Sequence, residues 1–397
     1  MDAMSHIAVV SIPLHGHVNP SLEIVRTLVQ RGHRVSYANG AAFAEVIEGT
    51  GAELRPYDSM LPSDGGSGDY EPVEMLTFFL DDAIAMLPQL RAIFTDDRPD
   101  LFLYDIAGRP ARLLGEQWGI PTMQLSSTFV AWDGYQEEMA PMIEAMRADP
   151  RVVDYYQRFE AWLTEEGSSV TDGLAFQGQA VRSLVLLPEA LQPNADRVNR
   201  SAYSFVGPVL GDRALQGTWT RPAGAEKVLL VSLGSEFTKQ PEFYRRAVAA
   251  FGELPGWHTV LQIGRHVDPA DLGVVPDSVE VHQWVPQLAV LEQADAFVTH
   301  AGMGGSSEGL YCGTPMIAVP QAADQFANAT QLAALGVARV LDSATVTAAE
   351  LREALLALTS DPAVLARSAE LKHQAREAGG ADRAADLIEA ELKATTA

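Results

Sequence analysis

Four groups of residues between positions 284 and 325 have side chains suited to different parts of one kind of ligand. They are Trp284-Val285-Pro286-Gln287, the glycine-rich run from His300 to Ser306, Glu308, and Asp324-Gln325. An indole ring stacks on a base, and a glycine-rich helix start binds a pyrophosphate. Carboxylate and amide groups bind the hydroxyl groups of ribose and of a sugar. Together the four groups predict a nucleotide-sugar site.

The glycine-rich run is the expected pyrophosphate site. It follows a predicted strand at Ala296–Thr299, and we expect a helix to begin near Gly304. The first N–H groups of a helix lack partners within it, and the helix dipole is positive there. Taken singly, the glycines could form an ordinary turn, and His300 could be a core histidine. The run is not G-x-G-x-x-G, because Ser307 occupies the third glycine position, which disfavours an NAD dehydrogenase.

A second candidate site lies in the first half of the chain. We expect His15 to lie in the loop after the strand His6–Pro13, and Asp105 to end the strand Asp100–Asp105. The first and fourth strands of a doubly wound sheet often flank its switch point, where ligands bind. Taken alone, His15 could be a surface or structural residue, and the family resemblance given below makes it the expected general base, with Asp105 accepting from its other ring nitrogen. His17 is interpreted as a surface or structural residue, and two histidines alone make a poor metal site.

Alternating strand and helix patterns supply the elements that position these residues. Short apolar runs alternate with amphipathic stretches along the whole chain, which predicts parallel sheets covered by helices. The segment from Gly211 to Lys227 has no clear period and indicates a linker. We expect an α/β fold with two Rossmann-like domains facing across a cleft, at 1–215 and 216–379. A C-terminal helix at about 380–397 is expected to pack back on the first domain.

The bulk composition excludes several classes of protein. The 397 residues carry 28 Lys and Arg against 52 Asp and Glu, a net charge of −24, which argues against nucleic acid as a partner. The single cysteine, Cys312, excludes an internal disulfide and a multi-cysteine metal site. No apolar run is long enough to span a membrane, and no targeting signal is recognisable. We expect a cytoplasmic protein, as a monomer or a homodimer.

The segment 284–325 resembles the donor-binding signature of the family 1 UDP-sugar-dependent glycosyltransferases, which have the GT-B fold. Plant members show W-x-P-Q, then H-C-G-W-N-S-x-x-E, then D-Q, and Gly304 and Gly305 depart from the plant Asn and Ser. These departures resemble the bacterial macrolide glycosyltransferase branch. The resemblance extends over essentially the whole chain, including the segments 15–23 and 231–235.

The resemblance implies a role for each matching residue. Trp284 would stack on uracil, Val285 would bind it through its backbone, and Glu308 would hold the ribose. Residues expected to complete the donor site are Gln287, the pyrophosphate-binding Ser235, His300, Gly302, Gly305 and Ser306, and the sugar-binding Asp324 and Gln325. Hydrophobic residues in stretches that line the acceptor pocket of similar enzymes are Met75, Phe78, Phe79, Trp132, Tyr135, Met139 and Met142.

The expected reaction is an inverting transfer of glucose from UDP-glucose to a hydroxyl of a macrolide-type or other hydrophobic natural product, inactivating an antibiotic. The chain contains no D-x-D triplet, so we expect no essential metal and no other cofactor. Another natural-product pathway, with a flavonoid or polyketide acceptor or a deoxysugar donor, is the main alternative. A UDP-GlcNAc 2-epimerase would act without an acceptor, and a non-enzymatic binding module would need no His15–Asp105 pair.

Overall fold

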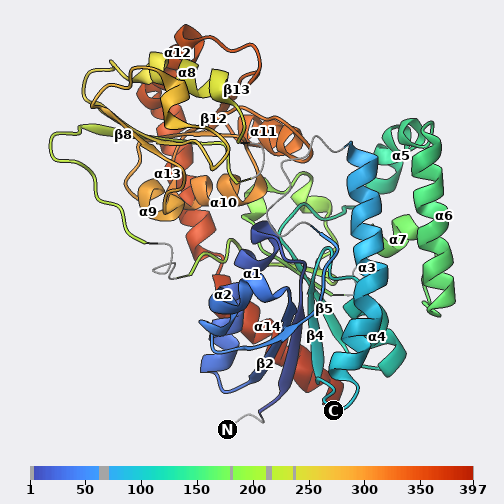
Figure 1. The fold of residues 1–397 in the computed structure, drawn as a ribbon. Helices are drawn as coiled ribbons and strands as arrows, with labels where there is room; N and C mark the ends of the chain where they lie inside the picture. The colour runs from blue at the N-terminus through green and yellow to red at the C-terminus, as the bar shows by residue number, and fades with distance from the viewer. Residues whose placement is uncertain (1–3, 62–70, 179–181, 212–216, 236–237, 397) are drawn as a thin grey trace. The chain divides into compact units, whose positions relative to one another are not determined.

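The computed structural model describes residues 4–61, 71–178, 182–211, 217–235 and 238–396, and its ribbon is drawn in Figure 1. The chain divides into two compact units. The first contains Met1–Leu187, Asn194–Val209 and Gly379–Ala397, and the second contains Pro188–Pro193 and Leu210–Ala378. Each unit is built on one parallel sheet, so the predicted pair of doubly wound sheets is confirmed.

The sheet of the first unit has seven strands in the order β3-β2-β1-β4-β5-β6-β7. Every described strand pair is parallel. The strands are β1 (His6–Val10), β2 (Arg34–Asn39), β3 (Glu53–Pro56), β4 (Leu101–Asp105), β5 (Thr122–Ser126), β6 (Ser183–Val185) and β7 (Tyr203–Phe205). The sequence prediction missed β3 and β7, which are the two strands at the edges of this sheet.

Helices cover both faces of this sheet. They are α1 (His15–Gln30), α2 (Ala44–Glu48), α3 (Pro72–Phe94), α4 (Pro110–Trp118), α5 (Tyr135–Met146), α6 (Pro150–Glu165), α7 (Gly173–Gly178) and α14 (Gly380–Thr396). Successive strand residues point to opposite faces. In β1, Ile7 and Val9 therefore pack with α1 and α14, whereas Ala8 and Val10 pack with α3, α4 and α6.

The C-terminal helix α14 belongs to the first unit. Ala384, Ala385 and Ile388 are fully buried against the same core as Ile24 and Leu28 of α1. The ribbon in Figure 1 shows this red helix beside the blue strands of the N-terminal segment. The expected domain boundaries were 215/216 and 379/380, whereas the units of the structure change at 209/210 and 378/379.

The sheet of the second unit has six parallel strands in the order β10-β9-β8-β11-β12-β13. They are β8 (Lys227–Ser232), β9 (Trp257–Gln262), β10 (Val279–His282), β11 (Ala296–Thr299), β12 (Met316–Ala318) and β13 (Ala338–Val340). Its helices are α8 (Pro241–Phe251), α9 (Gln287–Leu291), α10 (Met303–Cys312), α11 (Gln325–Ala334), α12 (Ala348–Ser360) and α13 (Pro362–Glu377).

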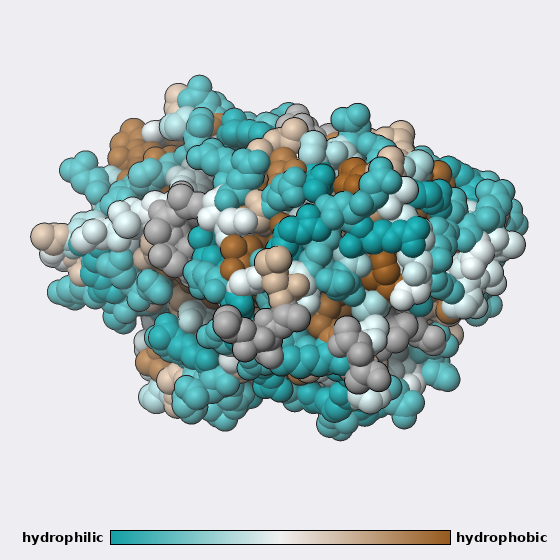
Figure 2. All heavy atoms as spheres, turned by 90° about the horizontal axis from the view of Figure 1, so that it is seen from below, coloured by the Kyte–Doolittle hydropathy of each residue, from teal (hydrophilic) through white to brown (hydrophobic). Residues whose placement is uncertain are grey.

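Hydrophilic residues cover most of the face shown in Figure 2, and hydrophobic residues form only small, scattered groups on it. None of the helices in the described parts of the chain is long and apolar enough to cross a membrane.

Candidate active site

The topology brings the predicted site residues to the switch point of each sheet. In the first sheet the chain runs outward in both directions from β1 and β4, and in the second from β8 and β11. Crevices that bind ligands form at such points, outside the carboxyl ends of the strands. Asp105 ends β4, while His300 follows β11 and Gly234-Ser235 follow β8.

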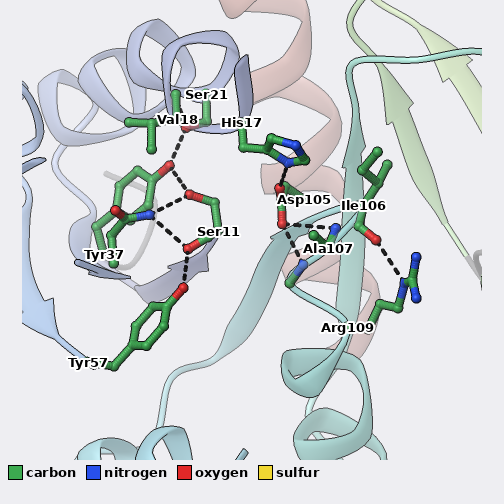
Figure 3. Close-up of polar contacts among 12 residues, drawn as sticks. Ser11, His17, Val18, Ser21, Tyr37, Tyr57, Asp105, Ile106, Ala107 and Arg109 are labelled. Atoms are coloured by element: carbon green, nitrogen blue, oxygen red, sulfur yellow. Dashed lines mark hydrogen bonds and ion pairs between the residues drawn. The ribbon is translucent and has the colours of Figure 1, made fainter. Parts of the chain in front are cut away.

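Asp105 is buried and held by backbone donors. It is 6% exposed, and its Oδ1 accepts hydrogen bonds from the N–H groups of Ala107 and Gly108. Gly108 leaves no room for a side chain, because a Cβ there would lie 2.5 Å from the Val10 carbonyl oxygen and 2.9 Å from Asp105 Oδ1. The carboxylate is thus fixed with its second oxygen, Oδ2, pointing toward α1 (Figure 3).

His17 is the histidine that the structure pairs with Asp105, so the expected pairing with His15 is corrected. His17 Nδ1 lies within hydrogen-bond distance of Asp105 Oδ2, as Figure 3 shows. The expected loop is instead the first turn of α1, which begins at His15. Because each helical residue turns by 100°, residues 15 and 17 point about 200° apart. The exposed ring of His15 faces Phe43, with ring centroids 5.0 Å apart.

The hydrogen bond between His17 and Asp105 determines which ring nitrogen can act as a base. A carboxylate only accepts, so Nδ1 of His17 carries the proton and Nε2 keeps a lone pair. The His17 side chain is 20% exposed, so the ring is partly open to solvent. A histidine oriented in this way by a buried carboxylate can take a proton from a hydroxyl group and remain stabilised as an imidazolium.

His300 packs closely against two glycines, Gly234 in the loop after β8 and Gly302 in the loop after β11. A Cβ on Gly234 would lie 2.6 Å from His300 Cε1, and a Cβ on Gly302 would overlap His300 Nε2. Burial lowers the pKa of His300 to about 4, although the backbone of Ser232 opposes the shift. The imidazole is therefore neutral at neutral pH and can offer a phosphate one N–H donor but no charge.

Gly302→Ala is expected to displace His300, destabilise the second unit and weaken UDP binding. Forcing an extra methyl group into a packed site costs about 1–3 kcal/mol. Gly304→Ala is the matched control for stability, because a Cβ at Gly304 meets no atom within 4 Å. Thermal melting and calorimetric titration with UDP measure the two effects. Equal melting temperatures for the two variants would show that the contact with His300 does not matter.

Trp284 and Val285 form the expected base-binding segment between β10 and α9. The Trp284 side chain is free to stack on a ring, since the residue is 57% exposed. The N–H of Val285 donates to Gln262 Oε1 at 3.1 Å, and Gln262 Nε2 donates to the Gly234 carbonyl at 3.0 Å. Gln262 thus ties the two loops together. The N–H of Val285 is already used in the hydrogen bond to Gln262. If Val285 contacts a base through its backbone, as predicted, the contact is made by its carbonyl oxygen.

Glu308 and Gln287 are brought together from two helices. Glu308 is 4% exposed on α10, and its Oε2 accepts a hydrogen bond of 2.7 Å from Gln287 Nε2 at the start of α9. A buried carboxylate is costly unless hydrogen-bond donors surround it. The hydrogen bond from Gln287 orients this carboxylate at the start of α9.

The start of α10 has the features expected of an anion site. Gly302 is its N-cap and provides no side-chain capping bond, so no cap side chain uses the first N–H groups. Gly305 and Ser306 lie in the first turn and are buried, and Ser306 Oγ has no hydrogen-bond partner among the residues that the structure describes. Ser235, the remaining residue of the expected pyrophosphate site, is exposed just after β8.

Asp324 and Gln325 have different surroundings at the start of α11. Asp324 is exposed and accepts a hydrogen bond of 2.8 Å from Asn328 Nδ2. Gln325 is buried, and its Oε1 accepts from the N–H groups of Gln321 and Ala322 at 2.8 and 3.2 Å. The Asp324 carboxylate is therefore accessible to solvent, whereas the amide oxygen of Gln325 stabilises the preceding loop.

Two alanines in these loops have left-handed backbone conformations. The φ angles are +61° at Ala301 and +52° at Ala323, a region that residues other than glycine seldom adopt. Ala301 is held there by hydrogen bonds from its N–H to Thr299 Oγ1 and from Asn328 Nδ2 to its carbonyl. Such positions concentrate at functional sites. Asn328, which the sequence prediction missed, links the loop after β11 with Asp324.

The expected acceptor-binding residues lie in two segments of the first unit, and each retains some exposed surface. Met75, Phe78 and Phe79 are on α3, whereas Trp132, Tyr135, Met139 and Met142 are on α5 or just before it. The rings of Trp132 and Tyr135 meet edge to face at 4.8 Å, and Trp132 Nε1 donates to Glu138. No residue of α5 is fully buried, so its methionines are accessible.

Comparison with known proteins identifies the family. The family described as "UDP-glucoronosyl and UDP-glucosyl transferase" matches residues 188–389. The oleandomycin glycosyltransferase of Streptomyces antibioticus is 57% identical over 98% of this chain and 91% of its own. The chain belongs to this glycosyltransferase family. It is therefore a GT-B enzyme that transfers a sugar.

Solved structures of related glycosyltransferases agree with this assignment. The glycosyltransferase of kitacinnamycin shares 54% identity and a TM-score of 0.92, over 99% of this chain and 100% of its own. The calicheamicin glycosyltransferase shares 32% identity and a TM-score of 0.86, over 99% of both chains.

Two further groups bear on the chemistry of this glycosyltransferase. Within the described residues, no three His, Cys, Asp or Glu side chains are arranged to hold a metal ion. Cys312 is buried on α10, and burial raises the pKa of its thiol to about 12, so it remains a protonated core residue.

Proposed function

We propose that this enzyme transfers glucose from UDP-glucose to a hydroxyl group of a macrolide or a similar hydrophobic natural product, with inversion at the anomeric carbon. The observation that carries the catalytic part is the contact between His17 and the buried Asp105. The similarity to an oleandomycin glycosyltransferase over nearly the whole chain supports a macrolide as the acceptor.

In the proposed mechanism His17 Nε2 takes the proton of the acceptor hydroxyl. The oxygen attacks the anomeric carbon of UDP-α-glucose, the bond from that carbon to the UDP oxygen breaks, and a β-glucoside and UDP are formed. Asp105 keeps the proton on Nδ1 and stabilises the imidazolium by its charge. His17 thereby takes the role that the sequence had suggested for His15, because His17 has the carboxylate partner.

The donor is held by residues of the second unit in this proposal. Trp284 stacks on uracil, and the Val285 carbonyl accepts from its ring N–H. Glu308 binds the ribose hydroxyls. The N–H groups at the start of α10, with Ser306, His300 and Ser235, bind the pyrophosphate and stabilise the departing UDP without a metal ion. Asp324 binds hydroxyl groups of the glucose, which favours UDP-glucose over deoxysugar donors because a deoxysugar would leave such a polar group unpaired.

Glucosylation of an antibiotic hydroxyl blocks a polar group that the drug needs for its contacts, so we propose a role in self-protection or resistance. The acceptor is expected to bind at the exposed aromatic and methionine residues of α3 and α5, which form an adaptable apolar surface. Glu138 is already paired with Arg197 at 2.7 Å and with Trp132, so it is not a free counter-ion for an amino sugar.

Incubation with UDP-glucose and a panel of macrolides and flavonoids, read by mass spectrometry, tests this function. We expect a mass gain of one hexose on macrolides, unchanged when EDTA is added. Transfer only to flavonoids, or only from a deoxysugar donor, would overturn the acceptor or the donor assignment. Turnover of UDP-sugar without any acceptor would favour an epimerase. Loss of transfer in EDTA that Mg²⁺ restores would refute the metal-free mechanism.

A further inference from the structure

A line of buried hydrogen bonds runs from β2 to the first turn of α1, beneath the contact between His17 and Asp105 (Figure 3). Asn39 Nδ2 donates to Ser11 Oγ at 2.9 Å, and Ser11 Oγ lies 2.9 Å from the Tyr37 hydroxyl. The Tyr37 hydroxyl lies 2.7 Å from Ser21 Oγ, which donates to the Val18 carbonyl at 2.9 Å. All four polar side chains are buried.

The number of hydroxyl hydrogens determines which group donates in each hydrogen bond of this line. Each hydroxyl group has one hydrogen to donate. Ser21 gives its hydrogen to the Val18 carbonyl, so it must accept from Tyr37. The hydroxyl hydrogen of Tyr37 is then used in the bond to Ser21, so Tyr37 must accept from Ser11. Ser11 in turn accepts from Asn39. Burial, reinforced by the nearby negative charge of Asp105, raises the pKa of Tyr37, so the phenol keeps the proton that it donates.

The first turn of α1 needs an external anchor, because its own sequence stabilises it poorly. Leu14 at the N-cap offers no side-chain capping bond, and the first turn contains no acidic residue. Pro20 lies inside the helix and has no N–H, which removes one helical hydrogen bond. A helix without a capping side chain is less stable at its start. Val18, where the hydrogen-bond line ends, immediately follows His17.

The His17 ring is not closely packed on the side of this network. A cavity of about 10 Å³ is lined by His17, Asp105, Ser11, Ser21 and Tyr37, among other residues. This volume is about that needed for one water molecule. The position of the His17 ring therefore depends on its contact with Asp105 and on the backbone that carries it.

We propose that Tyr37 is a positioning residue for catalysis: by donating to Ser21 it fixes the first turn of α1 and so keeps His17 against Asp105. This inference rests on the proposed role of His17 as the base. Tyr37 itself does not transfer a proton to or from the substrate, because its hydrogen is committed to Ser21.

Tyr57 provides a matched control for Tyr37. It is a buried tyrosine whose hydroxyl donates to the Ser11 carbonyl at 3.0 Å, and it makes no hydrogen bond to α1 in the described structure. Tyr37→Phe and Tyr57→Phe each remove one buried hydroxyl group that contacts Ser11. Of the two, only Tyr37→Phe removes a hydrogen bond between β2 and α1.

The test is steady-state kinetics of the full-length enzyme with both variants, Ser21→Ala, and the double variant of Tyr37 and Ser21. We expect Tyr37→Phe to lower kcat roughly tenfold or more at unchanged KM for UDP-glucose, because small misplacements of catalytic groups are costly. Tyr57→Phe should keep the kcat of the unmodified enzyme despite a similar loss of thermal stability. The double variant should be no slower than either single variant, since both break one link.

Equal kcat values for Tyr37→Phe and Tyr57→Phe, or additive losses in the double variant, would overturn the inference. If Tyr37→Phe does not fold, Ser21→Ala breaks the same link from the side of α1 and is compared with Tyr57→Phe in the same way. His17→Ala separates the two proposals. If the His17→Ala enzyme is active, His17 is not the base. If His17→Ala is inactive and Tyr37→Phe is fully active, only the proposed role of Tyr37 is refuted.

Discussion

His17→Ala is expected to lower kcat by roughly 10²–10⁴-fold, because general base catalysis typically contributes that much. His15→Ala is the control and should retain activity within about tenfold of the unmodified enzyme. Both histidines lie in the first turn of α1, but only His17 has the buried Asp105 at its ring nitrogen. Initial rates with a saturating acceptor measure the effect.

UDP binding should be unchanged in both histidine variants, since the residues proposed to bind UDP lie in the second unit. Calorimetric titration with UDP therefore checks that each variant is folded. A low kcat for His15→Ala together with a normal kcat for His17→Ala would show that His15 is the general base, as the sequence had suggested.

Glu308→Ala is expected to raise the KM for UDP-glucose by roughly 10²-fold or more. Each hydrogen bond between a hydroxyl and a buried carboxylate contributes about 1.5–3 kcal/mol, and each 1.4 kcal/mol changes affinity tenfold. Glu292→Ala removes an exposed carboxylate at the end of α9 and should leave the KM unchanged.

A UDP-glucose analogue lacking the ribose 2′-hydroxyl completes this test. The enzyme with Glu308 should bind the analogue less tightly than UDP-glucose, whereas the Glu308→Ala enzyme should bind both about equally. This is the result expected when the deleted carboxylate and the deleted hydroxyl form one interaction. Equal discrimination by both enzymes would show that Glu308 does not bind the ribose.

The sequence predicted the parts of the fold that depend on strong local patterns. The apolar runs His6–Pro13, Asp100–Asp105 and Ala296–Thr299 were expected as strands, and each of them overlaps a strand of the structure. The missed strands β3, β7 and β13 contain three or four residues each and lie at sheet edges. Strands this short give only a weak pattern, and in Glu53–Pro56 the residues are also partly exposed.

The start of α1 could not be predicted from local preferences. The sequence pattern predicted a helix from Ser21 to Arg31. The structure instead places Pro20 inside a helix that begins at His15. This difference of six residues moved both histidines from a loop to a helix and determined which one meets Asp105.

The residues of the donor-site motif were predicted from their types and spacing. The residues that hold the motif loops in place by hydrogen bonds were not predicted. Gln262 and Asn328 lie outside the motif, and their roles arise from contacts with segments 23 and 27 residues away in sequence. Gln262 had one signal, a polar amide at the end of an otherwise buried strand. The contacts themselves exist only once the strands are arranged in the sheet.

The position of α14 has a consequence for the order in which the chain folds during synthesis. The second unit ends at Ala378, whereas the first still lacks Ala384, Ala385 and Ile388 at that point. Domains that are continuous in sequence fold as they leave the ribosome, N-terminal first. Here the core that α1 shares with the first sheet lacks the contribution of α14 until this helix is made. The part of the chain that is translated first therefore completes its core last, after the donor-binding unit has been fully synthesised.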